Sequence, residues 1–128
     1  MNKAKKQQIT QLILSKVTNV KLIFLFGSQI NGSATYKSDI DIAILTNQKL
    51  DPIKRWDIQN ELANALNSDV DLIDLLMAST VMQNQIVMTG VCIYQVEQQL
   101  DKFTMKVMSM YQHLNDERRD IISQFYNS

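Results

Sequence analysis

A short, almost wholly apolar run from Val20 to Phe26 (VKLIFLF) constrains this chain more than any other segment. Its β-branched and aromatic residues favour a strand, and the near absence of polar positions indicates burial on both faces of a sheet. The run ends at Gly27, and a polar stretch follows as far as Ser38. A strand buried on both sides needs helices packed above and below it, which predicts a layered α/β domain.

Further strands follow from alternation of apolar and polar residues. In Asp39 to Leu45 (DIDIAIL) the three isoleucines point one way and the two aspartates the other, the period of two that is typical of a strand. Asp69 to Leu75 (DVDLIDL) alternates in the same way, and Val91 to Tyr94 is predicted as a short fourth strand. The sequence therefore predicts four strands in one small sheet.

Helical spacing of apolar residues fills the gaps between these strands. Asp51 followed by Pro52 is a strong helix start, with an N-cap acceptor before proline at the first helical position. The predicted helices cover about 2–17, 52–67, 80–90 and 97–126, the last with a polar break or continuation at 115–119. We expect one α/β (α+β) domain over 1–128, with a core at about 20–95 and a C-terminal helix at about 97–126.

Composition excludes several classes of function. The 128 residues suit one domain, and 13 basic against 13 acidic residues leave no positive surplus for direct nucleic-acid binding. One cysteine and one histidine exclude a disulfide framework and zinc sites built from several such ligands. The apolar runs are far shorter than the roughly 20 residues of a membrane span, and no signal peptide is visible. We expect a cytoplasmic protein without membrane contact.

One group of residues is suited to ligand binding and catalysis: Gly27-Ser28, ten residues, then Asp39-Ile40-Asp41. Glycine after a strand permits close backbone approach to a ligand, and the hydroxyl and N–H groups of a following turn suit a phosphate. Asp39 and Asp41 leave the same face of a strand, roughly 7 Å apart. Carboxylates held this way repel one another unless a cation such as Mg²⁺ joins them.

A third acid would complete such a metal site, and the strand at 69–75 offers Asp69, Asp71 and Asp74. Asp71 is preferred because it lies between apolar Val70 and Leu72, and an isolated acid in such a run usually has a partner or a task. Asp69 and Asp74 remain alternatives.

The spacing Gly27-Ser28-x10-Asp39-x-Asp41 resembles the signature of the DNA polymerase β-like nucleotidyltransferase superfamily. More narrowly, the chain resembles minimal nucleotidyltransferase (MNT) domain proteins, many of which are antitoxins of HEPN–MNT toxin–antitoxin pairs. The resemblance implies a nucleotidyltransferase fold, a small mixed sheet flanked by helices. It also implies that Gly27 and Ser28 contact the triphosphate of ATP, and that Asp39, Asp41 and Asp71 form the catalytic, Mg²⁺-binding set.

By the same resemblance, the function is transfer of AMP from ATP to a tyrosine hydroxyl of a partner HEPN ribonuclease toxin, which neutralises it within a hetero-oligomer. Gln29 and Asn31 stand where family members often carry arginines. That departure favours a first alternative, an antitoxin of little or no activity that masks the toxin by binding. Nucleotidylation of a small molecule is a lesser alternative, since no acceptor domain is visible.

Overall fold

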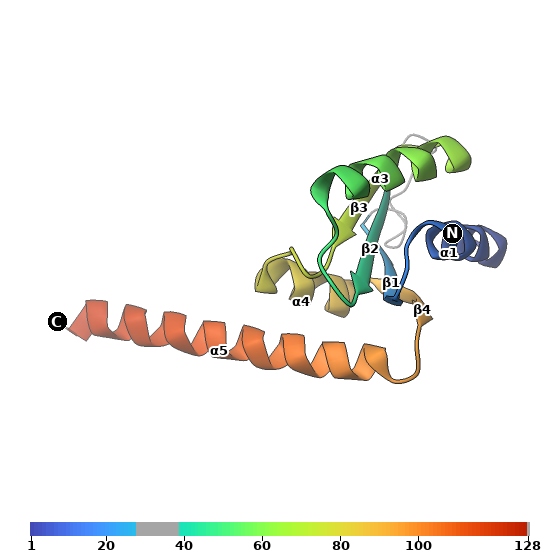
Figure 1. Ribbon diagram of the computed structural model, residues 1–128. Coiled ribbons are helices and arrows are strands. Elements are labelled where there is room, and N and C mark those ends of the chain that lie inside the picture. The colour runs from blue at the N-terminus through green and yellow to red at the C-terminus, as the bar shows by residue number, and fades with distance from the viewer. Residues whose placement is uncertain (28–38, 128) are drawn as a thin grey trace.

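The computed structural model describes residues 1–27 and 39–127 and confirms the predicted order of helices and strands. Figure 1 shows a small sheet with helices on both faces and a long helix that extends beyond the body of the protein. In chain order the elements are α1 (Lys3–Lys16), β1 (Val20–Phe26), β2 (Ile40–Thr46), α3 (Pro52–Leu66), β3 (Val70–Asp74), α4 (Thr80–Thr89), β4 (Val91–Gln95) and α5 (Gln99–Asn127).

The sheet has the strand order β3-β2-β1-β4. β1 pairs antiparallel with both β2 and β4, while β2 and β3 run parallel. A parallel pair needs a crossover, and α3 supplies it between β2 and β3. The C-terminal end of β1 and the N-terminal ends of β2 and β3 therefore meet at one end of the sheet.

Two apolar clusters lie on opposite faces of the sheet. The cluster under α1 and α3 contains Ile40, Ile42 and Ile44, which confirms the alternation predicted for this strand. The cluster under α4 and α5 contains Phe24, Ala43 and other residues from the opposite faces of the same strands. β1 contributes to both clusters, so its burial on two faces is also confirmed.

The predicted helix starts are confirmed by their caps. The Asp51 side chain accepts a hydrogen bond from the Lys54 N–H at 3.4 Å, and Pro52 occupies the first helical position of α3. The Ser79 hydroxyl caps α4 by accepting from the Met82 N–H at 3.1 Å. α5 continues without interruption through 115–119, so the polar segment there is a continuation and not a break. None of the helices in the described ranges combines the length and apolarity needed to cross a bilayer.

Side chains from α3 cover the free edge of β3. The Leu72 N–H donates to Gln59 Oε1 at 2.9 Å, and Arg55 Nη1 donates to the Leu72 carbonyl oxygen at 2.9 Å. An edge strand otherwise presents unpaired backbone groups. Arg55 and Gln59 are four residues apart on one face of α3, so the helix closes this edge at the centre of β3.

Asp74 anchors the end of β3. It is buried, with 3% of its surface exposed, and its two carboxylate oxygens accept hydrogen bonds from the N–H groups of Leu50 (2.8 Å) and Leu76 (3.0 Å). Its carboxylate thus ties the segment before α3 to the turn after β3.

We predict that Asp74→Asn lowers the free energy of unfolding by about 1–3 kcal/mol, because one of the two oxygen acceptors becomes a donor that faces a backbone N–H. Urea denaturation measures the change. Asp57→Asn, at an exposed position of α3, is the matched control and should change the stability by less than about 0.5 kcal/mol. Equal effects of the two substitutions would contradict the role given to Asp74.

Candidate functional site

Strand register brings Asp41 and Asp71 side by side. Asp41 is the Cα partner of Asp71 on β3 and of Phe26 on β1. Neighbouring strands lie about 4.8 Å apart, and residues directly opposite in a sheet point to the same face. Two aspartates distant in sequence therefore share one face at one end of the sheet, next to the residue that precedes Gly27.

Gly27 lies against the Asp41 carboxylate and adopts a backbone conformation suited to glycine. Its φ is +80°, in the left-handed region. A Cβ built on it would overlap Asp41 Oδ2 and lie 3.1 Å from Asp41 Cγ. Glycine is thus required here both by the turn and by the space that Asp41 occupies. Ser28 and the loop positions Gln29 and Asn31 lie outside the described residues.

The electrostatics of Asp41 reflect its surroundings. Partial burial raises the pKa of Asp41 above its ordinary value, and the negative charges of Asp71 and Asp39 raise this pKa further. Asp39 and Asp71 are themselves exposed. Because both neighbours raise the pKa of one carboxyl, the three acids predicted as a set lie close enough to interact electrostatically.

The chemistry of this set suits a hard divalent cation, which prefers carboxylate oxygens and offsets their repulsion. In the described ranges, 1–27 and 39–127, no three His, Cys, Asp or Glu side chains stand in an arrangement that could hold a metal ion. Asp39 and Asp71 are exposed and their side chains can rotate, so a cation would gather these donors on binding. The carboxylates of Asp39, Asp41 and Asp71 are of the donor type that fits Mg²⁺.

The structure distinguishes the three acids of the β3 region. Asp74 lies on the opposite face, buried with Val70 and Leu72, and both its oxygens accept backbone hydrogen bonds. Asp69 precedes β3 and is exposed, and its backbone carbonyl accepts from the Ile40 N–H at 2.9 Å. Asp71 alone of the three is the register partner of Asp41.

Arg55 is a neighbour of Asp71 that the sequence pattern does not single out. Both residues line a 370 Å³ pocket between the start of α3 and the end of β3. The guanidinium is held by the Leu72 carbonyl, next in the chain to Asp71. In the sequence, Arg55 and Gln59 are marked only by their spacing of four residues on one helical face. Exposed helix residues commonly have this spacing, so it does not predict a role beside Asp71.

Residues 7–99 match the family model described as polymerase beta, nucleotidyltransferase. The chain is 43% identical over 122 residues to protein adenylyltransferase MntA of Shewanella oneidensis, and the match covers 95% of this chain and 88% of that protein.

Two solved structures resemble the whole chain. A crystal structure of a toxin–antitoxin with AMP-PNP contains a chain that is 44% identical, with a TM-score of 0.86 and coverage of 93% of this chain and 96% of the other. A structure of tri-AMPylated Shewanella oneidensis HEPN toxin in complex with MNT antitoxin contains a chain that is 42% identical, with a TM-score of 0.82 and coverage of 97% and 98%. The family model matches most of this chain, and the chain carries its aspartates on neighbouring strands in one region. This chain therefore belongs to the polymerase beta nucleotidyltransferase family.

Proposed function

We propose that this protein is a Mg²⁺-dependent protein adenylyltransferase that transfers AMP from ATP to a tyrosine of a HEPN toxin and thereby neutralises it. The observation that carries the proposal is the 43% identity along 95% of the chain to a protein adenylyltransferase. The resemblance to chains solved with AMP-PNP and with an AMPylated HEPN toxin supports the nucleotide and the partner.

In the proposed reaction the acceptor hydroxyl attacks the α-phosphorus of ATP. A new oxygen–phosphorus bond forms, the bond from the α-phosphorus to the bridging oxygen breaks, and pyrophosphate leaves. Asp71 accepts the proton of the attacking hydroxyl, a role that suits an exposed carboxylate beside Asp41. Gly27 and Ser28 bind the triphosphate, because a glycine that follows a strand lets the backbone approach a ligand closely.

Asp39, Asp41 and Asp71 would hold Mg²⁺. When bound, the ion supplies positive charge to the transferring phosphoryl group and to the leaving group. The repulsion that raises the pKa of Asp41 supports this assignment, because a divalent cation removes the same repulsion. We expect the reaction to take place in the cytoplasm, where ATP is available.

Exposed apolar side chains on α5 favour a second candidate function, neutralisation by binding alone. Met105, Ile121 and Phe125 are 73%, 66% and 75% exposed. α5 extends away from the sheet in Figure 1, which leaves its outer part accessible to a partner. Such a helix could mask a toxin without any transfer of AMP.

We predict that Asp39→Asn with Asp41→Asn abolishes transfer of labelled AMP to the toxin while the circular dichroism spectrum is unchanged, because these acids face the site and not the apolar clusters. The assay contains the chain, the toxin, α-labelled ATP and Mg²⁺. A variant that still neutralises the toxin at equal stoichiometry would favour the masking function. Retained label transfer would contradict the proposed metal ligands.

Asp71→Asn is expected to lower the rate of transfer by about 10²–10⁴-fold, the usual contribution of a general base. Asp69→Asn is the matched control, since Asp69 is also exposed and lies two residues before Asp71, directly ahead of β3. It should retain the rate within about threefold, because the hydrogen bond of Asp69 to β2 is made by its backbone carbonyl, which the substitution leaves in place. Single-turnover kinetics compare the two variants, and an equal loss in both would contradict the assignment of Asp71.

The raised pKa of Asp41 predicts a pH dependence of stability in the metal-free protein. Near neutral pH the folded state holds an ionised Asp41 at a cost, so Asp41→Asn should raise the free energy of unfolding, by no more than about 1 kcal/mol because solvent screens the charges. As the pH falls through the raised pKa, the native wild type binds a proton before the unfolded chain does. The difference in free energy of unfolding between the variant and the wild type therefore becomes smaller.

Urea denaturation with a chelator, at several pH values, measures this difference between Asp41→Asn and the wild type. Added Mg²⁺ should stabilise the wild type and leave the variant unchanged. A metal-free variant that is less stable than the wild type at pH 7 would contradict the account of Asp41.

A further inference from the structure

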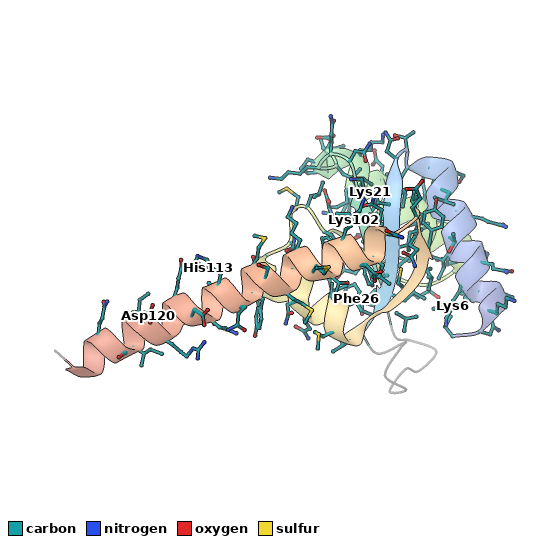
Figure 2. The ribbon with its side chains drawn as sticks, turned by 90° about the horizontal axis from the view of Figure 1, so that it is seen from below. Lys6, Lys21, Phe26, Lys102, His113 and Asp120 are labelled. Carbon is teal, nitrogen blue, oxygen red and sulfur yellow. The ribbon has the colours of Figure 1, made fainter. Side chains whose placement is uncertain are left out.

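A cavity of 540 Å³ lies at the end of the sheet opposite the acidic site. It is bounded by the start of β1, the end of β2, and the facing parts of α4 and α5. Figure 2 shows Lys21 and Phe26 at opposite ends of β1, with Lys102 near Lys21 at the start of α5. Lys21 and Phe26 are five positions apart on β1, about 16 Å, so the lysine end of this cavity lies about a strand's length from Gly27.

Three lysines line the cavity, and none of its described lining residues is acidic. Lys21 comes from β1, while Lys102 and Lys106 are one helical turn apart on α5. The ion pairs found among the described residues include none of the three. The whole chain has as many acids as bases, so a general surplus of lysine does not explain this grouping.

The remaining walls combine apolar and hydrogen-bonding groups. Phe103 and Val107 are buried members of the cluster under α4 and α5 and line the cavity, and each is next in the chain to one of the two lysines of α5. Asn47, Thr80 and Gln99 add polar side chains around the opening. The volume is within the usual range of small-ligand sites, about 300–1,000 Å³.

We propose that this cavity binds a small polyphosphate anion, either an inorganic polyphosphate or the phosphate chain of a nucleotide. Three ammonium groups from two elements can converge on a ligand that carries several negative charges, and each supplies up to three donors. Bringing like charges together without an acid is unfavourable, and a polyanion offsets that repulsion. The ligand would link the base of α5 to β1.

Isothermal titration calorimetry with tripolyphosphate and a chelator tests the proposal. The full chain carries Asp39→Asn and Asp41→Asn, which removes the proposed metal site, and binding should persist. Adding Lys102→Gln and Lys106→Gln should weaken binding about tenfold, while adding Lys3→Gln and Arg118→Gln should change it less than twofold. The control pair is exposed, lies outside the cavity and changes the net charge equally.

Absence of binding, or equal weakening by the two pairs, would overturn the proposal. Circular dichroism of each variant checks that the exposed substitutions leave the fold intact. ATP in the same chelator-containing buffer separates the two sources of the anion. Binding that is tighter than that of tripolyphosphate and is weakened by Lys102→Gln with Lys106→Gln assigns a nucleotide, and equal binding assigns the phosphate chain alone. Binding that the lysine pair leaves unchanged belongs to Gly27 and Ser28 and would overturn the proposal. Label transfer to the toxin is measured separately, so failure of this site is distinguishable from failure of the proposed function.

Discussion

The register between β2 and β3 is the constraint on which the acidic site depends. It places Asp41 beside Asp71 and, in the same pairing, Ile40 beside Val70. A slip of one residue would turn the aspartates toward the cluster under α1 and α3, and the isoleucines toward the opposite face of the sheet. The burial of Ile40, Ile42 and Ile44 therefore holds two carboxylates together although they repel each other.

That repulsion is tolerated because it is local and partly solvated. Asp41 is partly buried, whereas Asp39 and Asp71 are exposed. Water screens the outer charges, and the cost falls mainly on the Asp41 carboxyl, whose pKa rises. Gly27 belongs to the same arrangement, because any side chain there would occupy the space of the Asp41 carboxylate. The site is thus one unit built from three strands.

The two ends of the sheet differ in charge although the chain as a whole is balanced. Acids gather where β1 ends and β2 and β3 begin, and lysines gather where β1 begins. The antiparallel pairing of β1 and β2 separates these groups by the length of a strand. α5 belongs to the basic end, where Phe103 and Val107 anchor it to the sheet, and its outer part projects away from the domain (Figure 1).

Most of the fold could be predicted because its signals are local. The alternation of DIDIAIL, the Asp51-Pro52 helix start and the apolar run at Val20–Phe26 each depend on neighbouring residues. The sequence does not distinguish a break from a continuation of α5 at 115–119, because a polar segment is compatible with either a loop or a solvated helix. The roles of Arg55 and Gln59 at the edge of β3 could not be predicted, since they depend on how α3 packs.

The four strands, the helices around them and the alternation that places Asp41 opposite the isoleucines can be predicted from the sequence alone, because the period of a side-chain pattern follows from backbone geometry. The choice among Asp69, Asp71 and Asp74 required the three-dimensional structure. These acids are nearly equivalent in a linear pattern, and strand register and backbone hydrogen bonds separate them: Asp71 lies beside Asp41, while Asp74 is committed to the N–H groups of Leu50 and Leu76.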